Sequence, residues 1–229
     1  GGHDAGDARP HDGEAECLVI AEAYLPVMDA MTRRPAALVD SRVVVVGEPR
    51  PGQQRWQALL EVGDPGFVAP ADVGLDDLLN IQYTSGSTGT PKGVILSHAN
   101  LLANIRGASR GVQATGEDVF VSWLPLYHDM GLIGACLATL YNGIELVLMS
   151  PIRFLTRPQR WLWAIHRHRG TLSAAPNFAY ELCLSKIDDK AIEGLDLGTW
   201  RLSLNGAEPV SPNAVESFCR RFAPYGFRR

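Results

Sequence analysis

Hydrophobic residues along the chain fall into short runs with two kinds of spacing. Some runs are continuous, rich in valine, isoleucine and leucine, and bounded by glycine, proline or polar residues, which is typical of buried strands. Between these runs, apolar residues recur three and four positions apart, which indicates helices with one buried face. The clearest strand is the valine run Val43–Val46, closed by Gly47, and we expect it to be buried on both faces.

The pattern predicts a series of strands and helices. Strands are expected at residues 17–20, 43–46, 81–83, 94–96, 118–124, 144–149, 171–174 and 200–204. Helices are expected at residues 24–31, 56–60, 98–108, 131–141, 158–168, 177–186 and 212–222. Ser97 and Ser211 are predicted to cap the helices that follow them, and Pro158 fits a first helical turn. The buried face of helix 158–168 is predicted to contain Trp161, Leu162 and Ile165.

This alternation predicts an α/β fold in which mostly parallel sheets are flanked by helices. In such sheets, ligands bind beyond the carboxyl ends of the strands. Three turns that contain chemically useful residues follow predicted strands directly, at residues 84–93, 127–129 and 205–206. We therefore expect these turns to meet at one rim of a sheet and to form a single site.

The turn at residues 84–93 reads TSGSTGTPKG and consists mainly of hydroxyl residues, glycines and one lysine. Glycine exposes backbone N–H groups, and together with hydroxyls and a cation these groups can surround phosphate oxygens. The Walker pattern does not fit, because Pro91 occupies the place of its second glycine and Gly93 the place of its hydroxyl residue. The dinucleotide-binding pattern G-x-G-x-x-G fails as well. A flexible linker is the other interpretation, which the flanking apolar runs disfavour.

Composition narrows the possible functions. The chain has 229 residues, 46% of them hydrophobic, and a net charge of −4, which argues against a protein that binds nucleic acid. The sequence has no long uncharged apolar run and no signal peptide, so we expect a cytoplasmic protein without a membrane span. The four cysteines lack C-x-x-C spacing, and we interpret the three that lie in apolar helical patterns as small buried hydrophobic residues. Arginines gather at 153–169 and 220–229, either as solvated helix faces or as an attraction for an anionic partner.

The stretch WLPLYHDMGLIG places His128 at a predicted turn between a strand and a helix. Taken alone, it favours a helix cap by Asp129 with His128 merely exposed. A metal site is disfavoured, because no second histidine or cysteine lies at ligand spacing. A serine hydrolase is disfavoured too, because the chain has no G-x-S-x-G motif.

Together these stretches resemble the adenylate-forming enzymes, which comprise the acyl-CoA synthetases and their relatives. The string YTSGSTGTPKGV is similar to the phosphate-binding signature of that family at essentially every position. The form SWLPLYHDMGLIG looks most like fatty acyl-AMP ligases and long-chain acyl-CoA synthetases. The resemblance runs from about Glu16 to the end of the chain, and it implies part of the large N-terminal domain of such an enzyme.

The resemblance implies roles for particular residues. Those expected to bind the phosphates of ATP are Thr84, Ser85, Gly86, Ser87, Thr88, Gly89 and Lys92. Those expected at the adenine ring are Asn205, Gly206, Ala207, Glu208 and Pro209, although an ordinary turn would look the same. Those expected near the acyl group are His128, Asn177, Phe178 and Tyr180, although a core helix would also explain the last three. His128 is also the candidate catalytic residue of this chain.

The implied reaction has two steps. A fatty acid carboxylate attacks the α-phosphate of ATP, and the resulting acyl adenylate then passes its acyl group to a thiol of CoA or of phosphopantetheine on an acyl carrier protein. The first step requires in-line positioning and neutralisation of the pyrophosphate that leaves. Lys92 can follow that group as a mobile charge. Mg²⁺ would share this role, held by Thr84 or by the phosphates alone.

The resemblance covers only a middle portion of such an enzyme. The chain ends at YGFRR, before the family's magnesium-binding glutamate, its ribose-binding aspartate and its C-terminal domain. We expect residues 1–15 to be flexible, residues 16–229 to form a partial AMP-binding domain, and the chain alone to be unable to complete adenylation. A non-catalytic nucleotide-binding fragment or regulatory homologue stays open as an alternative. An unrelated nucleotide hydrolase fits less well, because the Walker spacing fails.

Overall fold

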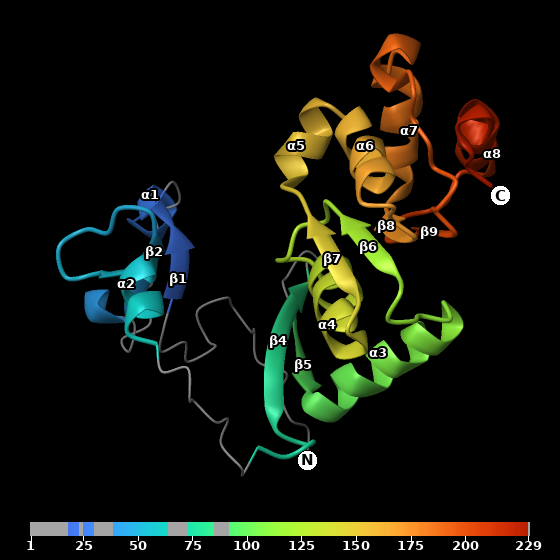
Figure 1. Ribbon diagram of the computed structural model, residues 1–229. Coiled ribbons are helices and arrows are strands. Elements are labelled where there is room, and N and C mark those ends of the chain that lie inside the picture. The colour runs from blue at the N-terminus through green and yellow to red at the C-terminus, as the bar shows by residue number, and fades with distance from the viewer. Residues whose placement is uncertain (1–17, 23–24, 30–38, 64–72, 85–91, 229) are drawn as a thin grey trace. The chain divides into compact units, whose positions relative to one another are not determined.

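A computed structural model describes residues 18–22, 25–29, 39–63, 73–84 and 92–228 (Figure 1). The chain divides into two compact units, Gly1–His98 and Ala99–Arg229. The expected flexible segment at residues 1–15 lies outside the described residues. Among the described helices, none is long and apolar enough to cross a membrane.

The first unit contains a three-stranded parallel sheet in the order β1-β2-β3. Its strands are β1 (Leu18–Ala21), β2 (Val43–Val46) and β3 (Gln54–Arg55), and its helices are α1 (Leu25–Asp29) and α2 (Trp56–Glu61). Val43 and Val45 pack against Leu25 and Met28 of α1. The prediction that β2 is buried on both faces is confirmed for its first three valines, but it is wrong for Val46, which is 44% exposed at the end of the strand.

The same unit contains an antiparallel pair of strands, β4 (Leu78–Thr84) and β5 (Lys92–Ser97), which forms a sheet of its own. Thr84 pairs directly with Lys92, so residues 85–91 connect neighbouring antiparallel strands. This corrects the expectation of a buried strand whose phosphate loop shares the rim of one parallel sheet with two other turns. The connection itself gives the reason: a parallel crossover needs about a dozen residues or more, and seven are too few. Ile95 and Leu78 are accordingly exposed within this pair.

The second unit is built on a four-stranded parallel sheet in the order β7-β6-β8-β9. The strands are β6 (Val119–Ser122), β7 (Glu145–Leu148), β8 (Leu172–Ala175) and β9 (Leu202–Asn205). All four residues of β8 are buried, as expected for a central parallel strand that is covered on both faces. The mostly parallel α/β class predicted from the sequence is therefore confirmed.

Helices surround this sheet, and Figure 1 shows α3 on one side of the four strands and α5, α6 and α7 on the other. They are α3 (His98–Gly111), a π-helix (Met130–Leu137) continued by α4 (Ala138–Asn142), α5 (Pro151–Thr156), α6 (Gln159–Arg167), α7 (Asn177–Lys186) and α8 (Pro212–Phe222). The predicted cap of α8 is confirmed, because Ser211 Oγ accepts a hydrogen bond from the backbone N of Ala214 at 3.3 Å. The sequence pattern did not predict α5.

The core of the second unit lies between the sheet and helices α6, α7 and α8. Trp161, Leu162 and Ile165 are all fully buried, which confirms the predicted inner face of α6. Cys183 is buried among them, and desolvation raises the pKa of its thiol, so it behaves as the small hydrophobic residue that the sequence predicted. Cys136 and Cys219 are half-buried.

Candidate functional site

The turn that contains His128 follows β6 and leads into the π-helix. Ser122 Oγ accepts a hydrogen bond from the backbone N of Leu124 at 3.1 Å and so starts the turn. A Cβ atom on Gly131 would lie 2.2 Å from the carbonyl oxygen of Pro125, so only glycine fits where the helix begins. The Asp129 carboxylate accepts a hydrogen bond from Met130 N at 2.6 Å, which confirms the predicted helix cap.

His128 is exposed, as the capping interpretation also predicted, and its Nδ1 atom lies 2.7 Å from an oxygen of Asp129. Nδ1 also lies 3.2 Å from the backbone N of Met130. These contacts fix the orientation of the ring on the rim of the four-stranded sheet. An imidazole beside a carboxylate can form a hydrogen bond to a ligand or exchange a proton with it.

The turn after β9 approaches the first turn of α7. Ala207 has a left-handed backbone with φ of +68°, and this conformation directs the following residue back across the rim. Glu208 Oε1 accepts a hydrogen bond from the backbone N of Phe178 at 2.6 Å. A Cβ atom on Gly206 would meet nothing within 4 Å, so there is open space beside the turn. The carboxylate of Glu208 is stabilised by its position at the N-terminus of the ten-residue helix α7.

A cavity of about 340 Å³ joins these two turns. Its polar side chains are those of Tyr127, His128 and Glu208, and the remaining lining side chains are apolar. The full lining consists of Trp123, Leu124, Pro125, Tyr127, His128, Met130, Pro151, Leu155, Pro176, Phe178, Ala207 and Glu208. Four of the residues selected from the sequence therefore meet here: His128, Phe178, Ala207 and Glu208. A concave apolar site with a few convergent polar groups is typical of small-molecule binding.

Helix α5 supplies two lining residues that the sequence reasoning missed, Pro151 and Leu155. The available signal was Ser150 followed by Pro151, which is a common start of a helix, ahead of a short apolar run. Trp123 was part of the motif but received no role. Its ring stacks on Phe154 at 4.0 Å and closes the inner wall, and its buried indole nitrogen has no hydrogen-bond partner among the described residues.

Two residues selected as acyl-binding, Asn177 and Tyr180, face other parts of the second unit and lie outside the described lining of this cavity. Tyr180 is buried, and its hydroxyl lies 2.8 Å from Ser203 Oγ and donates to the carbonyl oxygen of Leu204 at 3.1 Å. Desolvation raises the pKa of Tyr180 to about 12, so the phenol stays neutral. A role of either residue in acyl binding stays a prediction.

Asn177 connects three elements through its amide. Its Oδ1 accepts hydrogen bonds from Ser211 N at 2.9 Å and from Asn205 Nδ2 at 3.3 Å. Its Nδ2 donates to Glu181 Oε1 at 2.9 Å. The side chain therefore holds the turn between β9 and α8 against the start of α7.

Replacing Asn177 by leucine is expected to lower the free energy of unfolding by about 1–3 kcal/mol, because the part-buried donors Ser211 N and Asn205 Nδ2 would lose their acceptor. Urea titration followed by circular dichroism would measure the change. Asn213→Leu is the matched control, since Asn213 is exposed on α8 and should tolerate the change. Equal stability of the two variants would contradict the role assigned to Asn177.

The predicted phosphate loop belongs to the first unit. Of its selected residues, Ser85, Gly86, Ser87, Thr88 and Gly89 lie outside the described residues, as does the side chain of Thr84. The Lys92 side chain is exposed at the start of β5. In the part of the chain that the structure describes, no group of three or more His, Cys, Asp or Glu residues could hold a metal ion. The phosphate- and metal-binding assignments therefore stay predictions, as do those of Asn205, Gly206 and Pro209.

Comparison with known proteins identifies the family. Residues 9–227 match the model of the AMP-binding enzyme family. The medium-chain-fatty-acid–[acyl-carrier-protein] ligase JamA of Moorena producens is 46% identical over 158 residues, which cover 69% of this chain and 27% of JamA. The putative fatty-acid–CoA ligase FadD21 of Mycobacterium tuberculosis is 49% identical over 155 residues, which cover 65% of this chain and 27% of FadD21.

A solved structure from a study of the fatty acyl-adenylate ligases of E. coli and L. pneumophila matches with a TM-score of 0.79 and 33% identity. The match covers 94% of this chain and 37% of that structure. The chain thus spans between about a quarter and somewhat more than a third of the length of these relatives, and it belongs to the AMP-binding enzyme family.

Proposed function

We propose that the chain forms part of an enzyme that activates fatty acids with ATP. A carboxylate oxygen of the fatty acid attacks the α-phosphorus and forms the acyl adenylate, while the bond to the bridging oxygen breaks and pyrophosphate leaves. A thiol of CoA or of a phosphopantetheine-bearing carrier protein then attacks the acyl carbonyl. The thioester forms, AMP leaves, and the thiol proton is released. In this proposal residues 16–229 are a partial AMP-binding domain, and the enzyme acts in the cytoplasm.

The observation that carries the proposal is the cavity that joins the His128 turn, Phe178 and the Ala207–Glu208 turn. Its volume of about 340 Å³ falls within the range of small-molecule sites, which is about 300–1,000 Å³. Its apolar walls suit the hydrocarbon chain of a fatty acid. Its polar groups would lie near the bond between the carboxylate of the fatty acid and the α-phosphate of the nucleotide. We assign His128 to the carboxylate and the α-phosphate, and the turn at residues 205–209 to the adenine.

The loop at residues 84–92 would bind the pyrophosphate that leaves, through N–H groups, hydroxyls and the Lys92 ammonium. Mg²⁺ fits the same chemistry, with Thr84 and the phosphate oxygens as its expected ligands, and it would supply charge neutralisation. Lys92 contributes a charge that follows the leaving group as the bond to the α-phosphate breaks. The names of the relatives support this function, since JamA is named a fatty-acid–carrier-protein ligase and FadD21 a putative fatty-acid–CoA ligase.

Lys92→Ala in a full-length enzyme that carries this chain is expected to slow the release of pyrophosphate that depends on the fatty acid by about 10²–10³-fold, because one charge on the leaving group would be lost. Folding should not change, since the Lys92 side chain is exposed. Release of pyrophosphate from ATP would be measured with and without a medium-chain fatty acid.

Lys186→Ala is the matched control, because Lys186 is exposed at the end of α7 and outside the proposed site. An unchanged rate in Lys92→Ala would overturn the assignment of the loop. A wild-type enzyme that binds ATP but releases no pyrophosphate with any fatty acid would instead identify a non-catalytic nucleotide-binding protein.

A further inference from the structure

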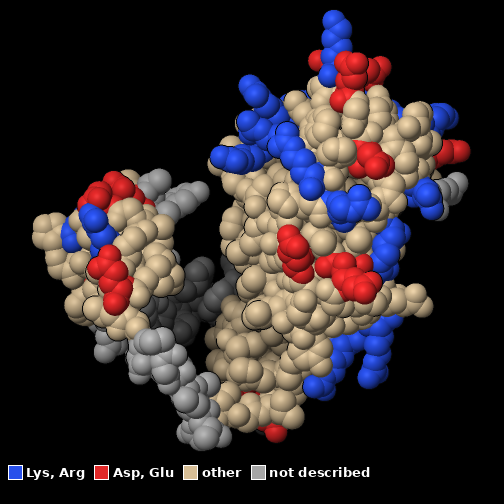
Figure 2. Space-filling view, viewed as in Figure 1, with Lys and Arg blue, Asp and Glu red and all other residues tan. Residues whose placement is uncertain are grey.

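Helices α5 and α6 present a strongly basic surface on a chain that is acidic as a whole. Residues 146–180 contain five arginines and two histidines, and no lysine, aspartate or glutamate. Figure 2 shows the blue side chains gathered over α5 and α6. We name this surface the arginine face, and its members are Arg153, Arg157, Arg160, Arg167 and Arg169, all of which are exposed.

A recess of about 320 Å³ lies within the arginine face. It is lined by Met149, Arg153, Arg160, Trp163, Ala164, Arg167 and His168. The Trp163 indole is held in place because its nitrogen donates a hydrogen bond to the carbonyl oxygen of Ala191 at 2.8 Å. The Arg167 guanidinium lies 5.7 Å from the centre of that ring. The recess therefore has a fixed aromatic wall and several guanidinium groups at its rim.

The arginines of this face have no acidic partner among the residues that the structure describes. Other arginines of the same unit do have one: Arg201 pairs with Asp118, and Arg221 pairs with Asp189. A surface that serves only solubility usually mixes both signs of charge. Arginine without lysine suits the recognition of phosphate or carboxylate oxygens, because its planar fork binds two oxygens at once.

The position of the recess connects it with the proposed site. Helix α5 contributes Pro151 and Leu155 to the acyl cavity and Arg153 to the basic recess. The two hollows therefore lie on different sides of one short helix, and a helix with its side chains is only about 10–12 Å wide. A pantetheine arm whose phosphate is held at the recess would pass around that helix to reach the acyl carbonyl.

We propose that the arginine face docks an acidic carrier protein, with the phosphodiester of its phosphopantetheine arm at the recess. The inference rests on the proposed function, since it names the acceptor of the acyl group. A protein partner fits better than a small anion, because Arg157 and Arg169 extend the basic surface beyond the recess. A nucleic acid fits worse, because the net charge of the chain is −4.

The test measures binding of a fluorescently labelled bacterial acyl carrier protein with its phosphopantetheine arm to the 229-residue chain, by anisotropy at increasing salt. Arg160→Glu and Arg167→Glu should each weaken binding about tenfold at low salt and reduce its dependence on salt, because like charges would then face each other. Arg110→Glu is the matched control, an exposed arginine on α3, and it should change binding less than about twofold.

Circular dichroism would confirm that each variant folds, and binding of an ATP analogue would be measured on the same preparations. Retained analogue binding with weakened carrier binding in both arginine-face variants supports the proposal. Wild-type protein that fails to bind the carrier, or variants that bind it as wild type does, would overturn the docking surface while leaving the proposed function intact. The surface assignment would also be overturned if the variants lost binding to anionic vesicles, RNA or free CoA but still bound the carrier protein as tightly as the wild type does.

Discussion

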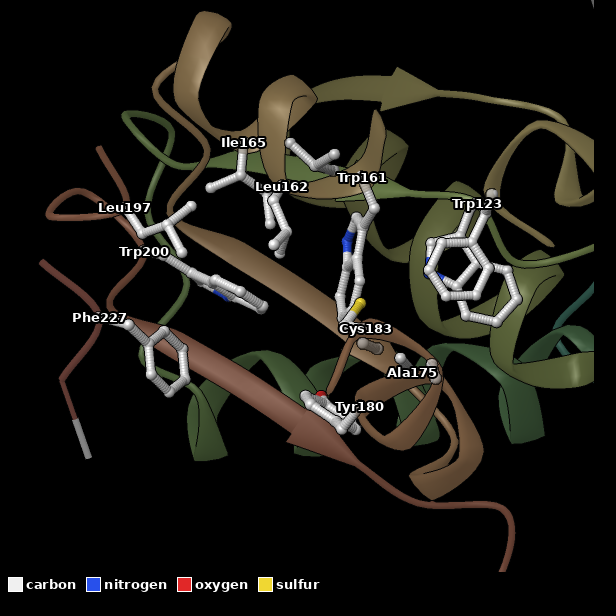
Figure 3. Close-up of a cluster of buried hydrophobic side chains, with 14 of the residues drawn as sticks. Trp123, Trp161, Leu162, Ile165, Ala175, Tyr180, Cys183, Leu197, Trp200 and Phe227 are labelled. Atoms are coloured by element: carbon white, nitrogen blue, oxygen red, sulfur yellow. The ribbon is translucent and has the colours of Figure 1, made fainter. Parts of the chain in front are cut away.

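Trp161→Ala is expected to lower the free energy of unfolding by about 3–5 kcal/mol, which is a large part of the stability of an ordinary domain. The side chain is completely buried, and its indole N–H donates a hydrogen bond to Ser173 Oγ at 2.9 Å. Figure 3 shows its ring between those of Trp123 and Trp200. The ring centroids lie 6.3 and 5.2 Å away, in edge-to-face geometry. Truncation would leave a cavity that the sheet and α6 cannot close.

Denaturant unfolding, followed by far-ultraviolet circular dichroism, would measure this loss. Trp161→Phe should cost less than alanine, because it keeps a ring in the cluster and loses mainly the hydrogen bond to Ser173. Leu140→Ala serves as control, since Leu140 is 77% exposed and should change stability by less than about 0.5 kcal/mol. If the alanine variant at Trp161 were as stable as the Leu140 variant, this cluster would not be the core of the second unit.

The sequence predicted this core well because the information was local. The spacing of Trp161, Leu162 and Ile165 gave the inner face of α6, and the predicted range 177–186 coincides with α7. The prediction for α6 depends on the helical period and on Pro158 at the start of that helix. The same kind of local signal gave the Asp129 and Ser211 caps.

The errors arose where pairing partners decide the outcome. A strand shows the same apolar pattern whether its neighbour is parallel or antiparallel. Only the short connection between β4 and β5 indicated that they pair as antiparallel neighbours, and the prediction did not use it. Val46 reads as part of a buried run, and only its position at the end of β2 exposes it. In α7 the period of the helix could not tell that Phe178 lines the cavity while Asn177 binds the turn after β9.

The candidate site was partly predictable for the same reason. Motifs identified His128, Ala207 and Glu208, and the parallel sheet brought their turns together at one rim. The wall from α5 and the role of Trp123 depend on how distant segments pack, so no local pattern predicted them. The ion pair between Asp118 and Arg201 is a further example, because 83 residues separate the partners and the sequence gave neither a role.

Arg201→Met is expected to lower the free energy of unfolding by about 2–3 kcal/mol at neutral pH. Breaking a buried ion pair costs about 3–5 kcal/mol, and the 39% exposure of the Arg201 side chain reduces that figure. The Asp118 carboxylate is buried and accepts hydrogen bonds from Arg201 Nε at 2.9 Å and Nη2 at 2.7 Å and from Thr171 Oγ1 at 2.6 Å. Arg201 also donates to the carbonyl oxygens of Val112 and Gln113. These bonds connect the beginnings of β6, β8 and β9.

The dependence on pH gives this prediction a definite sign. The hydrogen bond from Arg201 is the main cause that holds the pKa of Asp118 well below its ordinary value of 3.8, against the opposing effect of desolvation. A carboxyl group with a lowered pKa in the folded state stabilises the protein above about pH 3.8 and loses that contribution as the pH falls toward the folded pKa. In Arg201→Met the pKa of Asp118 should rise, so the variant takes up its proton at a higher pH than the wild type.

The difference in stability between wild type and Arg201→Met should therefore be greatest near neutral pH and should narrow as the pH falls below the pKa that Asp118 has in the variant. Urea unfolding of both proteins between neutral pH and about pH 3 would measure this. Arg110→Met, which removes an exposed charge from α3, should remain within about 0.5 kcal/mol of wild type throughout. A difference that stays constant or widens in acid would mean that Arg201 stabilises the sheet through the carbonyls of Val112 and Gln113, and that its pairing with the carboxylate of Asp118 contributes little.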